Sequence, residues 1–190
     1  MTAPWTQPIA AAVSVAQALQ SAVPVLETER LILRAPCLAD WPSIEPLWTS
    51  QRATFIGGPF NDEDAWLDFC QVMAGWVLRG ISGWALEHRQ TGETLGIVGL
   101  FFDFGDPGLD LGWLVTEAAE GHGYAFEAAM AARNYGHHTL KLRGLTSFIA
   151  PENARSIALA ERMGATPGAT HMYEGEEFCI YHHPDPEVMQ

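Results

Sequence analysis

The sequence predicts a mixed α/β fold, and three observations lead to that prediction. Short segments with alternating apolar and polar residues, typical of half-buried strands, are interspersed with segments whose apolar residues recur every three or four positions, as on a helix face. The order along the 190 residues is a strand, two helices, a β-meander and then β-α-β-α-β, with no internal repeat. Such an order predicts a single sheet with helices on both faces.

The first half of the chain supplies one strand and two helices. Leu26–Ala35 alternates in polarity and predicts a strand, whereas Leu38–Trp48 has a helical pattern. Asn61 precedes three acidic residues and predicts the start of a helix that runs to Arg79 and ends at Gly80. The face of that helix predicted to be buried contains Trp66, Phe69, Cys70, Met73 and Val77.

The second half alternates strands with helices. The predicted helices are Tyr124–His138 and a segment from the cap Asn153 to Met163, with Gly164 after its end. An acidic turn, Glu174–Glu177, joins the last two predicted strands. The predicted strands are Ser82–His88, Leu95–Phe102, Leu109–Val115, Leu145–Ala150, His171–Tyr173 and Phe178–His182.

Residues 1–24 differ in composition from the domain predicted over residues 25–190. Ile9–Val23 is rich in Ala, Val and Leu, and no Lys or Arg precedes Glu27, so the basic region of a secretory signal is missing. We expect a short helix around Pro8–Ala22 that packs on the body of the domain or on a second subunit. The second arrangement would make the protein a homodimer through its N-terminal extension.

The composition narrows the function classes. A formal net charge of −13 argues against a nucleic-acid partner, because the phosphate backbone demands Lys and Arg, and it permits attraction of a cationic partner. No apolar run approaches the roughly 20 residues of a membrane helix. Three widely spaced cysteines, Cys37, Cys70 and Cys179, predict reduced, mostly buried thiols in a cytoplasmic protein.

The most informative motif is the glycine-punctuated segment Glu120–Ala125, which follows a predicted strand and opens a predicted helix. Free backbone N–H groups and the helix dipole make such a turn an anion site, although the glycines also fit a simple tight turn. A dinucleotide-binding G-x-G-x-x-G is absent, because Ala125 and Phe126 follow Gly123, and so is the Gly-Lys-Ser/Thr of a P-loop.

A second motif narrows the choice of cofactor. The helix predicted to end at Met163 begins with the segment Pro151-Glu-Asn-Ala-Arg-Ser156. Two further segments precede it in the chain, Thr28-Glu-Arg-Leu-Ile-Leu-Arg34 and Leu111-Gly-Trp-Leu114. Together these segments resemble the GNAT acetyltransferase superfamily, most of all the branch with the ribosomal-protein N-terminal acetyltransferases. The resemblance spans roughly Leu26 to His183.

The resemblance implies a mostly antiparallel, twisted sheet of about seven strands with a splayed central strand pair. It also implies transfer of an acetyl group from acetyl-CoA to a primary amine by direct attack in a ternary complex. The acceptor stays open between a protein N-terminus, a polyamine, an aminoglycoside and another small amine. A non-catalytic sensor or interaction module that binds CoA or another ligand is the alternative.

The resemblance further implies a set of cofactor-binding residues. The pyrophosphate would lie on the turn, and the pantetheine arm would pair with the strand before it. Glu120 departs from the family's usual Gln or Arg, so we expect Arg155 or Arg133 to offset the phosphates. The implied cofactor-binding residues are Trp113, Leu114, Val115, Gly121, His122, Gly123, Tyr124, Ala125, Asn153, Arg155 and Ser156.

Two side chains are candidates for the chemistry. Asp110, on the central strand, is expected to act as general base through water, or else to be an exposed strand carboxylate. The family's tyrosine acid is replaced by Ala160, so Ser156 is the substitute proton donor, or else an N3 capping residue of its helix. Asn153 would cap that helix, bind pantetheine, or do both. Adjacent histidines such as His137-His138 point to different sides, so no metal site is expected.

Overall fold

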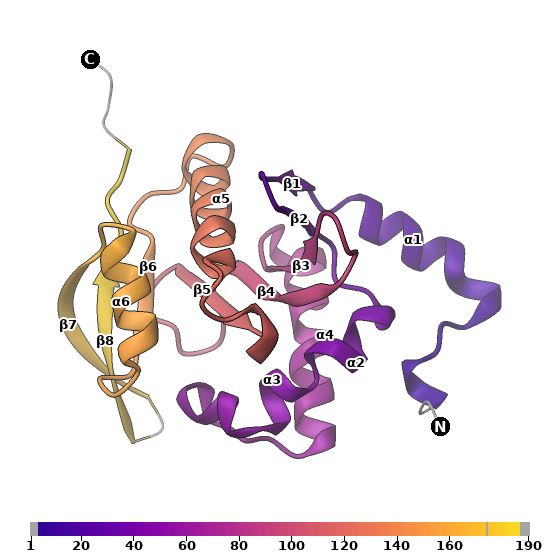
Figure 1. The fold of residues 1–190 in the computed structure, drawn as a ribbon, viewed down its shortest axis with the longest axis horizontal. Coiled ribbons are helices and arrows are strands. Elements are labelled where there is room, and N and C mark those ends of the chain that lie inside the picture. The colour runs from indigo at the N-terminus through magenta and orange to yellow at the C-terminus, as the bar shows by residue number, and fades with distance from the viewer. Residues whose placement is uncertain (1–3, 174, 187–190) are drawn as a thin grey trace.

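The structure is a computed structural model, and it describes residues 4–173 and 175–186. The described strands form one sheet in the order β1-β2-β3-β4-β5-β6-β8-β7 (Figure 1). Every neighbouring pair is antiparallel except β5 and β6, which confirms the predicted mostly antiparallel sheet. The strands are β1 Leu26–Glu27, β2 Leu31–Arg34, β3 Gly83–His88, β4 Thr94–Phe101, β5 Asp110–Val115, β6 Thr146–Ile149, β7 Thr166–Tyr173 and β8 Glu176–His182.

Eight strands replace the predicted seven, because the segment Leu26–Ala35 folds back on itself. The amide of Thr28 donates to the carbonyl of Leu31, 3.0 Å away, and this turn splits the segment into the antiparallel pair β1 and β2. At the other end of the chain, β7 begins five residues before the predicted His171 because it pairs with β8 on both sides of an irregularity at Pro167–Thr170. Glu174, predicted in the acidic turn, lies outside the described residues, and Glu176 and Glu177 belong to β8.

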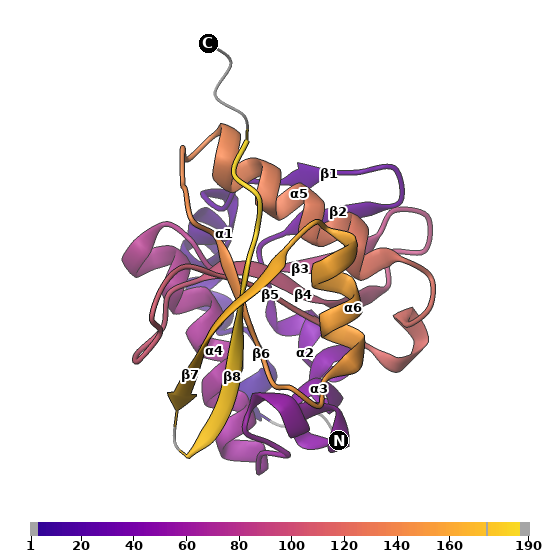
Figure 2. The same cartoon turned by 90° about the vertical axis from the view of Figure 1, so that its left-hand side faces the viewer.

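Helices cover both faces of the sheet, as predicted (Figure 2). Helix α5, Tyr124–His138, packs on one face, and helices α2, Trp41–Ile44, and α4, Asp62–Arg79, pack on the other. Successive residues of β4 show the division, since Val98 packs in the core beneath α5 and Ile97 packs against α2 and α4.

The segment predicted as one helix over Leu38–Trp48 is broken into short pieces. A 3-10 turn η3, Leu38–Asp40, leads into α2 and then into α3, Pro46–Thr49, followed by the 3-10 helix η4, Gln51–Ile56. Pro46 has no amide hydrogen, so α2 cannot continue through it. The break leaves η4 free to turn toward β5.

The buried face of α4 is rotated from the predicted one. Trp76 and Val72 are buried, whereas Val77 is 61% exposed and Cys70 is exposed. The orientation follows from the Trp76 indole, which donates to the carbonyl of Gly83 at 2.8 Å. The prediction of mostly buried thiols is therefore wrong, since Cys37 and Cys179 are only half-buried, although all three cysteines are free.

The N-terminal extension contains η1, Pro4–Thr6, η2, Ala10–Ala12, and helix α1, Val13–Ser21. No residue of α1 is buried. Contacts that attach the extension include a hydrogen bond from Gln20 to the carbonyl of Pro36 and one from the buried Trp84 indole to the carbonyl of Pro24. No helix in the part of the chain described here has the length and apolar character needed to cross a membrane.

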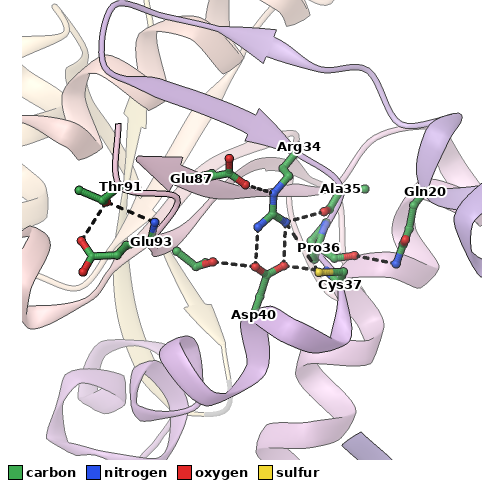
Figure 3. A network of polar contacts seen from close by, with 10 residues as sticks. Gln20, Arg34, Ala35, Pro36, Cys37, Asp40, Glu87, Thr91 and Glu93 are labelled. Carbon is green, nitrogen blue, oxygen red and sulfur yellow. Dashed lines mark hydrogen bonds and ion pairs between the residues drawn. The ribbon is translucent and has the colours of Figure 1, made fainter. Parts of the chain in front are cut away.

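A buried ion pair joins the first strands to the helices beneath them (Figure 3). Arg34 on β2 donates twice to Asp40, at 2.7 and 2.9 Å, and once to Glu87 on β3 at 2.6 Å. Asp40 also accepts from Thr94 on β4 and from the Cys37 amide, each at 2.7 Å. Burial raises the pKa of Asp40, but these donors outweigh burial and leave the pKa below its ordinary value.

Asp40→Asn is expected to destabilise the fold by about 3 kcal/mol near neutral pH, because it leaves Arg34 half-buried without its main counter-charge. Urea unfolding measures the loss. Since the Asp40 pKa is lowered, its contribution exists above the ordinary carboxyl pKa and fades as the pH falls, so the two proteins should converge in acid. Glu93→Gln, on the exposed turn of Figure 3, is the control and should change stability by less than about 0.5 kcal/mol.

Candidate active site

A cavity of about 870 Å³ opens where β5 and β6 part. It extends along β5, from the loop 102–109 that precedes this strand to the turn that follows it. Eleven of the twelve site residues predicted from the sequence line it. These are Asp110, Trp113, Leu114, Val115, Gly121, Gly123, Tyr124, Ala125, Asn153, Arg155 and Ser156.

The two parallel strands share a single register pair, Asp110 with Thr146. Neighbouring residues of a strand direct their backbone groups to opposite neighbours. The carbonyls of Leu109 and Leu111 accept from residues of β6, so the backbone groups of Trp113 and Val115 face the same side, which beyond Leu111 is the opening. A ligand in the cavity can therefore pair with β5 as a strand would.

The turn before α5 has the backbone form of an anion site. Gly121 and Gly123 have φ values of +75° and +80°, which only glycine adopts without strain. A side chain at Gly121 would meet no atom within 4 Å, so the backbone lies open at this point. Gly123 is the N-cap of α5, and the first amides of this helix lie at the cavity wall.

Arg30, in the turn between β1 and β2, anchors this loop, and no local pattern in the sequence predicts this role. Its guanidinium donates to the carbonyl of His122 at 2.8 Å and to Glu127 at 2.7 Å, and it lies 4.6 Å from the centre of the Tyr124 ring. Thr28 also donates to Glu127, in the first turn of α5. Burial raises the pKa of Glu127, but the hydrogen bonds that it accepts from Thr28 and Arg30 lower this pKa by more. The pKa therefore lies below its ordinary value, and the Glu127 carboxylate stays charged beside Arg30.

His122, the remaining predicted residue, does not line the cavity. Its ring is exposed and stacks on Tyr124, with 5.7 Å between centroids.

Glu120 is neutralised by two arginines from different elements. Arg52 of η4 and Arg155 of α6, Ala154–Arg162, both pair with the same oxygen of its carboxylate. Arg52 also donates to the carbonyl of Val115 at 2.8 Å. The Glu120–Arg52–Arg155 group therefore carries one net positive charge beside the anion turn. Arg133, the other expected partner, instead donates to the carbonyl of Met163 at 2.7 Å, because α5 directs it toward the end of α6.

Asp110 lies at the point where the strands part, and its carboxyl is half-buried rather than exposed. Burial raises its pKa to about 7, with Asp106 and Asp103 adding to the rise and the hydrogen bond from the Phe148 amide opposing it. Gly112 makes room for this side chain, since a methyl group there would lie 2.9 Å from Oδ2 of Asp110. A carboxyl with this pKa exchanges protons near neutral pH.

The helix motif supplies a cap and a hydroxyl. The side chain of Asn153 accepts from the Ser156 amide at 3.2 Å, which confirms that Asn153 caps α6. The hydroxyl of Ser156 accepts from the Trp113 indole at 3.2 Å, so its own hydrogen is available to another acceptor. Ala160 is fully buried, which fits its expected lack of a chemical role.

The mouth of the cavity before β5 is acidic and aromatic. Asp68, Asp103 and Asp106 line it together with Asp110, and Arg79 pairs with Asp103 at 3.1 Å. Burial raises the pKa of Asp68 and Asp106, and the charge of Asp103 adds to both shifts. The aromatic residues at this mouth are Phe55, Phe101, Phe104 and Tyr173.

Within residues 4–173 and 175–186, no group of three or more His, Cys, Asp or Glu side chains is placed to bind a metal ion. His137 is buried in α5, and burial lowers its pKa.

Comparison with known proteins identifies the family that shares this architecture. The family model described as "Acetyltransferase (GNAT) domain" matches residues 30–166. The chain belongs to the GNAT acetyltransferase family. The resemblance seen in its motifs is therefore confirmed.

Individual proteins extend the match beyond the family model. An acetyltransferase from Agrobacterium tumefaciens has a solved structure that is 36% identical and superposes with a TM-score of 0.80, covering 86% of this chain and 95% of that one. The Bacillus subtilis protein called uncharacterized protein YkkB is 29% identical, over 82% of this chain and 93% of its own length. RimL, a ribosomal L7/L12 N-terminal acetyltransferase solved with coenzyme A, shares the fold at 15% identity and a TM-score of 0.69, covering 85% and 98% of the two chains.

The role of Arg30 in holding the glycine turn before α5 can be tested through amide hydrogen exchange. Arg30→Ala should speed exchange at residues 121–123 by about tenfold, because a hydrogen bond to a charged group contributes about 1.5 kcal/mol. Arg143→Ala removes an arginine that is exposed and remote from the loop, so it should leave these rates unchanged. Equal exchange in both variants would show that Arg30 does not order the loop.

Proposed function

We propose that this GNAT protein transfers an acetyl group from acetyl-CoA to a primary amine by direct attack in a ternary complex. The observation that carries the proposal is the course of the cavity, which leads from the glycine turn, past the unpaired edge of β5, to the carboxyl of Asp110. The CoA complex of the fold neighbour RimL supports the assignment of the cofactor.

The residues along the cavity fit CoA. Amides of Gly121, Gly123 and Ala125 at the start of α5 would hold the phosphates, and Arg155, which is 68% exposed, can move from Glu120 toward them. The backbone of Trp113 and Val115 would pair with the pantetheine arm, and Asn153 also lines the cavity. Bound acetyl-CoA supplies an activated thioester.

The residues near the point where β5 and β6 separate would then transfer the protons. Asp110, through water, accepts a proton from the ammonium group so that the amine nitrogen can form a bond to the thioester carbon. A backbone N–H on the open edge of β5 would face the carbonyl oxygen, where negative charge grows. As the carbon–sulfur bond breaks, the Ser156 hydroxyl would donate its proton to the thiolate and take up the second proton, which the nitrogen releases as the amide forms.

The acidic mouth favours a cationic acceptor. Asp68, Asp103 and Asp106 line it, and Arg79 forms an ion pair with Asp103. Protein N-termini, polyamines and aminoglycosides all carry the required charge.

The test is a continuous assay of free CoA thiol with acetyl-CoA and a panel of amines from these classes, with mass spectrometry of the products. Thiol release that depends on an amine, with an amide product, supports the proposal. Tight CoA binding without acetylation of any amine contradicts it and favours the alternative, a CoA-binding sensor.

A general base must be deprotonated, so turnover should rise with pH through about 7 and then level off. Asp110→Asn should lower kcat by about a hundredfold or more and abolish that rise, while its side-chain oxygen still accepts from Phe148. A raised pKa means that the charged carboxylate costs stability above its unfolded pKa of about 4. The variant should therefore melt higher than the parent at pH 8 and equally at pH 4. A wild-type pH profile in the variant would exclude Asp110 as the base.

Glu120→Gln should tighten CoA binding by about threefold, because it removes a negative charge beside the phosphates and frees two arginines. The effect is small since the pair is partly solvated. Isothermal titration with CoA measures it. Glu117→Gln changes the same charge on an exposed residue of η5, Glu117–Ala119, and should not alter affinity. Weaker binding in Glu120→Gln would show that the carboxylate instead positions the arginines.

A further inference from the structure

The place where β5 and β6 part is set by side chains. In a regular parallel ladder, the hydrogen bond that follows the Asp110–Thr146 pair would join the Phe148 amide to the Leu111 carbonyl. In this structure each of these two groups bonds to a side chain of the opposite strand. The Phe148 amide donates to Oδ1 of Asp110 at 3.1 Å, and the Leu111 carbonyl accepts from the Ser147 hydroxyl at 2.6 Å.

His183, which follows β8, completes the arrangement. Its Nε2 lies 2.9 Å from Oγ of Ser147. The Leu111 carbonyl can only accept, so the Ser147 hydrogen points to it and His183 must donate from Nε2. Nδ1 of His183 then carries no hydrogen, and it is buried without a partner. Burial, with nearby Arg133 and His137, lowers the pKa of His183 to about 4, so the ring stays neutral and keeps this tautomer.

We propose that Asp110, Ser147 and His183 form a clasp that replaces one backbone hydrogen bond, or rung, between β5 and β6. The clasp fixes how far the opening between the two strands extends, and thereby the depth of the site for the acetyl group. Both strand groups are satisfied, so the strands have no drive to pair further. If the clasp is removed, the two groups can satisfy each other only by forming the regular rung, which would close about 6.6 Å of the opening. Ser147 and His183 are thus positioning residues, and this role rests on the proposed acetyl transfer.

The chain offers a matched control one rung earlier. Thr146 also donates its hydroxyl to a carbonyl of the neighbouring segment, that of Leu109 just before β5, at 2.8 Å. The Leu109 carbonyl additionally accepts from the Thr146 amide at 2.9 Å, so it keeps a partner without the hydroxyl. Thr146 and Ser147 are 6% and 2% exposed, so removing either hydroxyl from a buried site is comparable.

The kinetic test compares Ser147→Ala with Thr146→Val. Ser147→Ala should lower kcat by about tenfold to a hundredfold, since small misplacements of reacting groups have effects of this size. Its affinity for CoA should stay within about threefold, because the phosphate and pantetheine contacts lie elsewhere in the cavity. Thr146→Val should keep the parent's kcat. Equal kcat values in the two variants would overturn the proposal.

His183 supplies a rescue experiment. His183→Leu removes the donor to Ser147 and should lower kcat, whereas His183→Gln retains an N–H donor at a similar reach and should restore it. The same kcat in both variants would mean that the donor has no role in positioning.

A direct readout of the rung requires no turnover. In the double variant Asp110→Ala/Ser147→Ala, a through-hydrogen-bond NMR coupling between the Phe148 nitrogen and the Leu111 carbonyl carbon should appear, and it should be absent in the parent. Its absence in the folded double variant would contradict the clasp. If the double variant does not fold, Phe148 amide exchange in Ser147→Ala replaces it, and a rate unchanged from the parent would contradict the clasp. A parent that binds CoA but acetylates nothing would refute only the proposed function.

Discussion

A single unmade hydrogen bond, between the Leu111 carbonyl and the Phe148 amide, determines the form of the rest of the site. Strands left to themselves pair along their length, because an unpaired buried backbone group costs free energy. Here the side chains of Ser147 and Asp110 satisfy the two groups, and the sheet opens into a cavity without such a cost. Asp110 therefore combines two roles, since the oxygen that accepts from Phe148 keeps the strands apart while the carboxyl faces the cavity.

Ion pairs outside the cavity keep its walls in place. Arg30 and Glu127 attach the glycine loop to the β1–β2 turn, and Arg34 and Asp40 attach the first strands to α2. Arg52 has a different role, because it joins η4 to Glu120 and to the end of β5. The wall made by η4 and the loop at the start of α5 are thereby connected through one guanidinium, and the pairs of Arg30 and Arg52 bridge segments far apart in sequence.

Local pattern was sufficient to predict the sheet and the longer helices, and the family resemblance supplied eleven of the residues that line the cavity. The caps Asn61 and Asn153 and the glycine turn depend on neighbours in sequence, which explains why these predictions succeeded. Arg30, Arg52 and Ser147 were missed because their partners lie 36 to 97 residues away. The burial of Cys70 and Val77 was mispredicted because the Trp76 hydrogen bond to Gly83, a tertiary contact, sets the rotation of α4.

The acidic mouth before β5 has a consequence for substrate entry and product release. In the proposed reaction, a primary amine would arrive at Asp68, Asp103 and Asp106 as a cation, and acetylation would convert the reacting nitrogen into an amide, which carries no charge. The carboxylates would then attract the outgoing molecule less than the incoming one. The loss of one positive charge would thus favour product release, and a second amine would compete effectively for the vacated position.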